Sequence, residues 1–582
     1  MPQLIVSQVV ESGELGLDWG LSDLLFAEIG GRKILYAVSR TEGTLIELEM
    51  SSDGTVLVSR SLAIDGPFEV GSAPVLEFHD GALAIAGLSS ATGQFVSLAA
   101  DGALGSQYGA ANLGELVAPL SVGDFLISAD ANGDGLVVYD GSGAAMSWVS
   151  GLVDTDGIFL GDVSDTTATR IAGSDYIAAI SQSENGLSLI EVSAEGVLSV
   201  ADSFGTLDGL PVNMPSEVEA LQRLNETLLV IESSGSSSLS TMRVDTSGAL
   251  WLTDHVLDSN ETRFQAVSSV ETITVGEFAY VAAGGADGGI SLFTVLPGGR
   301  LVHLSTIADT ASTTLYRVSA LSMSYANGAL QIVGGSAWEA GLTRLTFDLS
   351  MQGSLLLAHD TTVGTALNDQ LIGTDTGDFL EAGDGEDILY DGHGQDTLSG
   401  GSGADLFVFA LDGMEDLILD FERGSDRLDL SSFDFLYDVS QLSVSPTGDG
   451  AVITFADEVL RIVSEDGNPL TSSDFSNSDI LNTDRPALLS VSQTLVGGVA
   501  GDVLNGNSGN DTLSGLAGDD LLSGGAGQDM IFGGEGADTL NGGSDDDTLD
   551  GGAGNDLVIG GAEDDLVNGG DGGDTIYGDD IA

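Results

Sequence analysis

Aspartate recurs every nine residues in two stretches of this chain, and no other feature of the sequence limits its possible folds as strongly. An aliphatic or aromatic residue stands two positions after each aspartate, as Leu513 does after Asp511. A block of acidic residues is usually a solvated tail, but fourteen aspartates in one phase indicate a repeat architecture. These are Asp369, Asp378, Asp387, Asp396, Asp405, Asp502, Asp511, Asp520, Asp529, Asp538, Asp547, Asp556, Asp565 and Asp574.

Each nine-residue unit predicts a short strand and a tight turn. The residues around the aliphatic, such as Thr512 to Ser514, suffice for a minimal strand with one side chain pointing inward. The glycine-rich remainder suits a turn with positive φ angles. Two units would form one coil, and the aspartates of successive coils would line up along each edge. A ligand set of carboxylates and backbone carbonyls, without His or Cys, favours Ca²⁺ over zinc. Mg²⁺ is less suited because it requires a smaller, octahedral coordination shell.

On these residues the two stretches resemble the RTX family, whose repeat GGxGxDxUx forms a parallel β-roll with Ca²⁺ between its turns. The resemblance covers residues 364–410 and 497–580. It implies that the fourteen aspartates supply carboxylates and that the preceding glycines supply carbonyls, for example Gly524, Gly525, Gly527, Gly533, Gly534 and Gly536. Weaker or missing calcium sites are expected where the glycines are replaced, at Thr376, Leu516, Asp545 and Glu563.

The segment between the two repeat stretches resembles the C-terminal region of serralysin-type proteases. It reads ADLFVF from Ala404 and DLILDFERGSDRLDLS from Asp416. The resemblance implies a cap on the roll that belongs to an export module. An ordinary β cap with no further role is equally open, because the ends of a solenoid need covering. The HExxH zinc motif of the protease is absent from the sequence.

The N-terminal part repeats at a longer period of about fifty residues, which falls in the range of β-propeller blades. Two apolar strands separated by a polar turn occur seven times, beginning near Ile34, Ala82, Phe125, Tyr176, Thr227, Phe278 and Ala329. The stretch from Phe278 to Leu304 looks like a blade of the lactonase-type propellers. That resemblance supports a fold and hardly constrains an activity.

These patterns predict an all-β chain made of four parts. They are a seven-bladed β-propeller over 1–360, a first RTX β-roll over 361–410, a serralysin-like β cap and linker over 411–490, and a second RTX β-roll over 491–582.

The charge of the chain excludes several classes of function. It has 90 acidic and 15 basic residues, a net charge of -75 and no cysteine. Nucleic acid and anionic membranes would be repelled, and disulfides, thiolate zinc sites and thiol catalysis are excluded. No uncharged apolar run is long enough to predict a membrane span. The acidic excess of the propeller shows no obvious period, so we expect it to serve solubility alone.

No catalytic constellation is found, so catalytic residues stay unknown and no organic cofactor is predicted. The propeller histidines, His79, His255, His303 and His359, are scattered among blades, and its tryptophans are expected to fill gaps between blades. Asp130, Asn132 and Asp134 have the opening spacing of an EF-hand loop, but Gly141 replaces its bidentate Glu, which favours a polar turn. The scarce arginines, Arg170, Arg223, Arg263 and Arg317, would form an anion site if they converged on the channel.

We therefore expect a secreted or cell-surface protein of a Gram-negative bacterium that binds several Ca²⁺ ions. It would leave through type I secretion machinery and fold outside the cell, because binding energy becomes folding energy. The propeller would bind a carbohydrate or cell-surface ligand. The alternatives are a lactonase-like or other hydrolase carried by the propeller, and a structural surface protein that self-associates.

Overall fold

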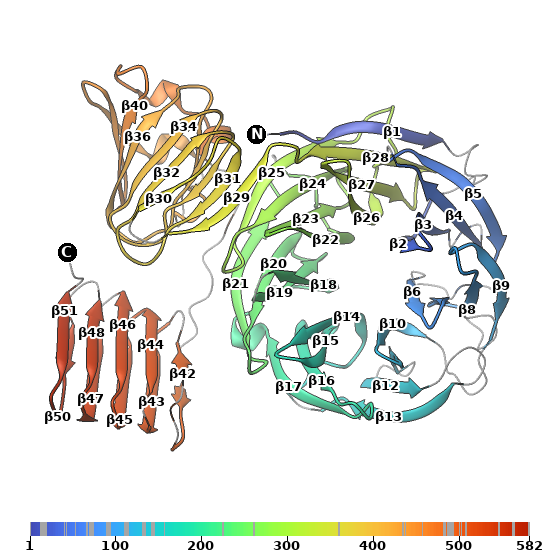
Figure 1. The fold of residues 1–582 in the computed structure, drawn as a ribbon, viewed down its shortest axis with the longest axis horizontal. Helices are drawn as coiled ribbons and strands as arrows, with labels where there is room; N and C mark the ends of the chain where they lie inside the picture. Colours follow the sequence, from blue (N-terminus) through green and yellow to red (C-terminus); the bar gives the residue numbers. More distant parts are fainter. Residues whose placement is uncertain are drawn as a thin grey trace. The chain divides into compact units, whose positions relative to one another are not determined.

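The computed structural model shows an all-β chain that divides into two compact units, residues 1–487 and 488–582 (Figure 1). Among the described residues no helix is long and apolar enough to cross a membrane. The structure describes residues 2–579 apart from 12–19, 40, 42, 53, 66–67, 69–74, 89–94, 110–115, 131–134, 141–145, 156, 224–225, 260–261, 359–360, 434–435, 437, 457, 481–482, 484, 486–493, 500, 502, 507–508, 519, 545–546 and 562–564.

The N-terminal part of the first unit is a seven-bladed propeller, as predicted. Each blade is a four-stranded antiparallel sheet, and the strands nearest the centre of the ring are β2, β6, β10, β14, β18, β22 and β26 (Figure 1). The strands of the first six blades are β2 (Asp23–Ile29), β3 (Arg32–Ser39), β4 (Thr44–Met50), β5 (Val56–Ala63); β6 (Leu76–His79), β7 (Ala82–Ile85), β8 (Phe95–Leu98), β9 (Leu104–Tyr108); β10 (Val117–Val122), β11 (Phe125–Ala129), β12 (Gly135–Asp140), β13 (Ser147–Val153); β14 (Val163–Ile171), β15 (Ser174–Ser181), β16 (Gly186–Val192), β17 (Leu198–Gly205); β18 (Pro215–Arg223), β19 (Glu226–Ser233), β20 (Ser238–Val244), β21 (Leu250–Leu257); and β22 (Ser269–Val275), β23 (Phe278–Gly284), β24 (Gly289–Val295), β25 (Leu301–Ala308).

The seventh blade is completed by the N-terminal strand. Its order is β1-β28-β27-β26, from β1 (Ile5–Glu11), β26 (Val318–Ala326), β27 (Ala329–Ser336) and β28 (Gly341–Asp348). Pairing of β1 with β28 closes the ring, and the Gln8 side chain exchanges two hydrogen bonds with the backbone of Val56 in the first blade. The fifty-residue period did not reveal this strand, because β1 is separated in sequence from the rest of its blade.

Middle strands such as β23 and β24 are buried along their whole length, because neighbouring blades cover both of their faces. These strands are the apolar runs by which the sequence predicts the blades.

The first β-roll follows the propeller in the same unit and consists of two parallel sheets. Leu371, Leu380, Leu389, Leu398 and Phe407 point inward between them and are fully buried. One sheet has the order β29 (Gln352–Leu357), β31 (Asn368–Ile372), β33 (Ile388–Tyr390), β35 (Leu406–Val408), β37 (Arg427–Asp429). The other has the order β30 (Thr361–Val363), β32 (Phe379–Asp384), β34 (Thr397–Ser402), β36 (Glu415–Phe421), β40 (Glu458–Ser464), β39 (Gly450–Phe455), β38 (Ser443–Pro446).

The roll and its cap share continuous sheets. The roll begins with β29, on the propeller side of residue 360, and its coils run past residue 410 into β36 and β37. The antiparallel strands β38 to β40, the helix α2 (Asn477–Ile480) and the short turns η2 (Val439–Gln441) and η3 (Ser472–Asp474) follow; the propeller holds a further turn, η1 (Thr206–Asp208).

Propeller and first roll are joined by one hydrophobic cluster. It includes Tyr280 and Leu292 of the propeller together with Leu355, Ile388 and Leu406 of the roll. The repeat periods alone predict a boundary at residue 360, between two separate domains.

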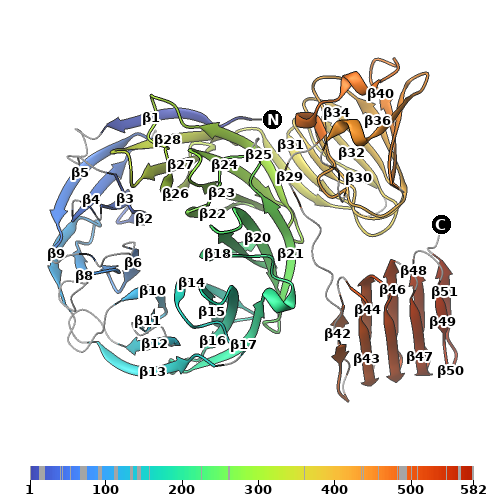
Figure 2. The same ribbon diagram turned by 180° about the vertical axis from the view of Figure 1, so that it is seen from behind.

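The second unit is a β-roll with a core one side chain wide. Its inward aliphatics, Leu513, Leu522, Ile531, Leu540, Leu549 and Val558, form a single stack. Figure 2 shows its strands side by side, viewed onto the face of a sheet. The first sheet contains β41 (Thr494–Val496), β43 (Thr512–Ala517), β45 (Met530–Glu535), β47 (Thr548–Gly554), β49 (Leu566–Asn568) and β50 (Asp571–Gly572); the second contains β42 (Val503–Asn505), β44 (Leu521–Ala526), β46 (Thr539–Ser544), β48 (Leu557–Gly561) and β51 (Thr575–Asp579). The predicted parallel β-rolls are therefore confirmed.

Candidate metal centre

The repeat aspartates bond to one another from coil to coil. Oδ1 of Asp529 accepts the backbone N–H of Asp511 at 2.7 Å, and Oδ1 of Asp405 accepts that of Asp387 at 2.9 Å. Each bond joins residues 18 positions apart, which is one coil. The same bond orients the carboxylates of Asp387, Asp396, Asp538, Asp547, Asp556, Asp565 and Asp574.

The second carboxylate oxygen is where a ligand is needed. Oδ2 of Asp387, Asp396, Asp405 and Asp556 is buried and has no hydrogen-bond partner among the described residues. A buried carboxylate oxygen without a partner is energetically costly. Because the same oxygen is buried at equivalent positions of several repeats, it points to a bound ion.

Glycine at the first repeat position leaves a small space beside this carboxylate oxygen. A Cβ placed on Gly533 would lie 2.5 Å from the carbonyl oxygen of Gly551 and 2.6 Å from Oδ2 of Asp538. A Cβ on Gly551 would meet the corresponding pair of atoms one coil later. A carbonyl oxygen and a carboxylate oxygen thus face the same small space, which is the hard donor set that Ca²⁺ prefers.

The six predicted glycine ligands occupy three kinds of position. Gly524 and Gly533 face an aspartate Oδ2, and Gly525 lies in β44 opposite Gly543. Gly527, Gly534 and Gly536 have φ angles of 111°, 118° and 147°, which only glycine adopts readily. Leu516 takes the position equivalent to Gly534 and holds a φ of 70°.

The electrostatics of the first roll also favour a cation. Burial, together with the charge of neighbouring carboxylates, raises the pKa of Asp387 to about 7 and that of Asp405 to about 6. Burial likewise raises the pKa of Asp396 to about 7. A divalent ion would replace the protons and remove the repulsion.

At Asp369 and Asp378 a threonine donates two hydrogen bonds to the second carboxylate oxygen, Oδ2. Oδ2 of Asp378 accepts from the backbone N–H of Thr374 at 2.7 Å and from its hydroxyl at 2.8 Å. Thr365 makes the same two bonds to Asp369. Threonine at the second repeat position therefore competes with a metal here, whereas the repeat pattern predicts a weaker site from Thr376 at the fourth position.

Asp416 and Asp426 continue the aspartate stack, and sequence analysis missed them. Oδ1 of Asp416 accepts from the N–H of Asp396, and Oδ1 of Asp426 from that of Asp405. These partners are 20 and 21 positions apart, so two or three extra residues hide them from a strict period. An aliphatic two positions after each, Ile418 and Leu428, was the available signal.

Several predicted features lie outside the described residues. They are Asp502, the replacements Asp545 and Glu563, His359, and Asn132, Asp134 and Gly141 of the EF-hand-like loop.

The propeller histidines and arginines have local partners. His79, His255 and His303 lie on three different strands, and each is within 3.1 Å of a hydroxyl group. Arg170, Arg223 and Arg263 pair with Asp175, Glu226 and Asp287, and Arg317 lies 5.0 Å from the ring centre of Trp338.

Two tryptophans do not fill gaps between blades. Trp148 and Trp338 are 63% and 62% exposed, so the expectation is wrong for both. Trp148 lies on β13, the fourth strand of its blade, and Trp338 lies on the turn between β27 and β28.

Carboxylates join the innermost strands of neighbouring blades. Each accepts a backbone N–H from the first strand of a following blade, as Asp165 does from Val218, 53 residues later. The expectation that these acids serve solubility alone is therefore wrong. The acceptors are Asp23, Glu77, Asp165, Glu217 and Glu271, at 2.7, 3.0, 2.9, 2.8 and 3.4 Å from their donor nitrogens.

Comparison with known proteins identifies the repeats. The RTX calcium-binding nonapeptide repeat family matches residues 363–407, 496–531, 523–558, 532–565 and 550–580. No curated protein matches the chain. A solved protein from Lactobacillus plantarum, a structural genomics target, is 12% identical, with a TM-score of 0.36 over 52% of this chain and 94% of its own. The C-terminal part thus carries RTX calcium-binding repeats, which are typical of secreted proteins.

Proposed function

We propose that this chain is a secreted protein whose rolls fold when Ca²⁺ fills the aspartate stacks outside the cell. The observation that carries this proposal is the row of buried Oδ2 atoms at Asp387, Asp396, Asp405 and Asp556, which have no hydrogen-bond partner in the part of the chain that the structure describes. Where calcium is scarce the carboxylates repel one another. At the roughly millimolar calcium found outside cells, even weak sites of the extracellular kind fill, and their binding energy stabilises the folded rolls.

The ions would be held by carboxylates and glycine carbonyls of neighbouring coils. The carboxylate ligands of the first roll are Asp387, Asp396 and Asp405. Those of the second roll are the repeat aspartates from Asp511 onward. Asp369 and Asp378 bind weakly or not at all, because threonine donors already occupy their Oδ2 atoms.

The route of export is type I secretion from a Gram-negative bacterium, to the medium or the cell surface. A chain without cysteine that stays unfolded at low calcium suits passage through a narrow channel.

The propeller is a binding module for a carbohydrate or cell-surface ligand. Trp338 supports this role, because its ring is 62% exposed and the Arg317 guanidinium lies 5.0 Å from its centre. An exposed indole offers a stacking surface, and the neighbouring arginine offers hydrogen-bond donors. Glycan binding should be lost in Trp338→Ala and retained in Trp148→Ala, which removes an equally exposed tryptophan. Hydrolysis of lactones in parallel assays would instead identify a hydrolase.

The folding mechanism is tested on the full chain by far-UV circular dichroism and limited proteolysis, with calcium or with chelator. We expect residues 364–405 and 497–579 to resist protease only in calcium. Asp387→Asn should raise the calcium concentration needed for protection. Asp378→Asn is the matched control and should leave that concentration unchanged. Rolls that resist protease in chelator would show that the mechanism is wrong.

A further inference from the structure

Asp391 occupies a repeat position that is glycine in most of the other units and alanine at Ala382. It follows β33 and begins the unit Asp391-Gly392-His393-Gly394-Gln395-Asp396, whereas the next unit begins with Gly400. Its side chain is almost completely buried, with an exposed fraction of 2%. A glycine at this position faces the carboxylate of the aspartate five residues later, so Asp391 adds a further carboxylate beside that of Asp396.

The three carboxylates converge. One oxygen from each of Asp391, Asp396 and Asp416 lies within 4.8 Å of the others. Asp416 belongs to β36, where the repeats pass into the cap, and Asp396 immediately precedes β34. Asp391 and Asp396 therefore lie at the two ends of the turn between β33 and β34, and Asp416 lies one coil later on β36.

Backbone donors hold one oxygen of each carboxylate. Oδ1 of Asp391 accepts from Ala410 at 2.8 Å, and Oδ1 of Asp416 accepts from Asp396 at 2.9 Å. Oδ1 of Asp396 accepts from Asp378 at 2.6 Å, while its Oδ2 is buried with no partner among the described residues. This fully buried, unsatisfied oxygen is the independent sign that the cluster takes a ligand.

Further negative charge surrounds the cluster. Oδ2 of Asp412 accepts from Gly394 in the same turn, and Glu458 accepts from the backbone N–H of Asp412. Burial, and then the charge of Asp416, raise the pKa of Asp391 well above its usual value. So many carboxylates are held together at low cost only if a cation lies among them.

We propose that Asp391, Asp396 and Asp416 form a three-carboxylate site for a hard cation, which binds Ca²⁺ more tightly than the repeats that lack the extra carboxylate and fills before them. The proposal rests on the calcium binding proposed above. The extra charge lowers the energy of a bound cation. Because Asp416 lies on β36, which pairs with the cap strand β40, the first ion to bind joins the repeats to the strand that carries the cap.

Calorimetric titration of the full chain with Ca²⁺ tests this site. The first equivalent should bind at least about tenfold more tightly than the following ones, as added ligand charge implies. Asp391→Asn keeps the acceptor for Ala410 and removes the charge, and Asp391→Gly restores the repeat pattern. Both variants should abolish the tight binding of the first Ca²⁺ equivalent and leave the binding of the later equivalents unchanged. Asp375→Asn removes an exposed charge from a neighbouring coil and should retain the tight event.

A second readout uses Tb³⁺, a harder trivalent cation. Tyr390 precedes Asp391, so excitation of tyrosine should produce terbium emission from the first equivalent, and Tyr390→Phe should remove that emission. An unchanged first event in both Asp391 variants would overturn the inference while leaving calcium binding intact. A wild-type chain that binds no Ca²⁺ would instead refute the proposed function.

Discussion

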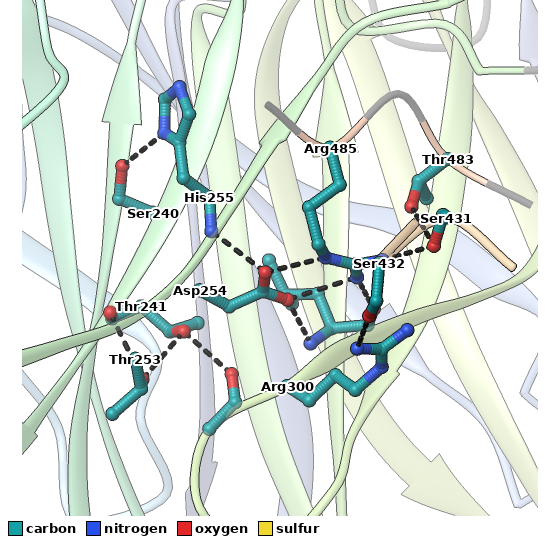
Figure 3. Close-up of polar contacts among 12 residues, drawn as sticks. Ser240, Thr241, Thr253, Asp254, His255, Arg300, Ser431, Ser432, Thr483 and Arg485 are labelled. Carbon is teal, nitrogen blue, oxygen red and sulfur yellow. Dashed lines mark hydrogen bonds and ion pairs between the residues drawn. The ribbon is translucent and has the colours of Figure 1, made fainter. Parts of the chain in front are cut away.

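Arg485 binds Asp254 across 231 residues of sequence, with Nε 2.7 Å from Oδ1 and Nη2 3.1 Å from Oδ2 (Figure 3). Asp254 lies on β21 of the propeller, whereas Arg485 follows the cap of the first roll. Both side chains are buried, with exposed fractions of 5% and 8%. Oδ2 of Asp254 also accepts the N–H of Leu301, so the carboxylate is fully satisfied.

A second arginine strengthens this connection. Arg300 of the propeller lies 3.7 Å from Asp429 and 5.5 Å from the ring centre of Tyr390, and it bonds to Ser432. Burial alone would raise the pKa of Asp254, but Arg485 holds it below its usual value. Propeller and first roll are thus joined by buried ion pairs as well as by apolar contacts.

Arg485→Leu should destabilise the first unit by about 3 to 5 kcal/mol, because it leaves Asp254 buried without its charge partner. Urea unfolding in saturating calcium measures the loss. Arg461→Ala is the control, since its pair with Asp449 is exposed and contributes about 0 to 1 kcal/mol. Equal stability of the two variants would show that the buried pair does not join the propeller to the roll.

The local periods of the sequence predicted much of the fold. The recurrence of aspartate every nine residues predicted the rolls, and the recurrence of apolar strand pairs about every fifty residues predicted the seven blades. Both periods are visible in the sequence because each unit makes the same contacts with the next unit. Long-range pairings were not accessible in this way. β1 pairs with β28 from the far end of the propeller sequence, and Arg485 meets Asp254 without any local signal.

The candidate site was predictable to the same extent. The period identified Asp387 and Asp529, but the insertions before Asp416 and Asp426 broke it. Whether a carboxylate oxygen is available to a metal ion depends on hydrogen bonds from neighbours such as Thr374. Only the structure reveals these hydrogen bonds.

Leu516→Gly should stabilise the second roll by about 1 kcal/mol. Leu516 holds a φ of 70° with its side chain half exposed, so the mutation relieves backbone strain and loses little burial. The thermal midpoint of residues 488–582 within the full chain should rise, measured by hydrogen exchange in saturating calcium. Leu516→Ala keeps the Cβ and should not reproduce the gain; if it does, relief of strain is not the cause.

The propeller should lose stability as pH rises from about 5 to about 8. Burial raises the pKa of Asp23 and Glu77 to about 7 and that of Glu271 to about 8, whereas unfolded carboxyls titrate near 4. The folded form therefore binds more protons in this interval, and the free energy of unfolding falls with pH. The stabilisation is complete at pH values below the pKa of the unfolded carboxyls. It is lost as the pH rises through the pKa values of the folded form.

Thermal unfolding at several pH values in saturating calcium measures this slope. Glu271→Gln keeps an acceptor for Met323 and cannot ionise, so it should flatten the slope. A slope identical to wild type would exclude Glu271 as a contributor.

Calcium affinity of the first roll should fall as pH decreases below about 7. In the empty roll, burial raises the pKa of Asp387 and Asp396 to about 7, so protons compete with the ion for the same oxygens. Above this pH the carboxylates are already ionised, and binding releases few protons. Calorimetry in buffers of different ionisation enthalpy counts the protons released, and release should grow between pH 8 and pH 6. Asp387→Asn should reduce that release, whereas Asp378→Asn should not, because Asp378 is satisfied by Thr374. Proton release independent of pH would mean that these carboxyls are ionised before calcium binds.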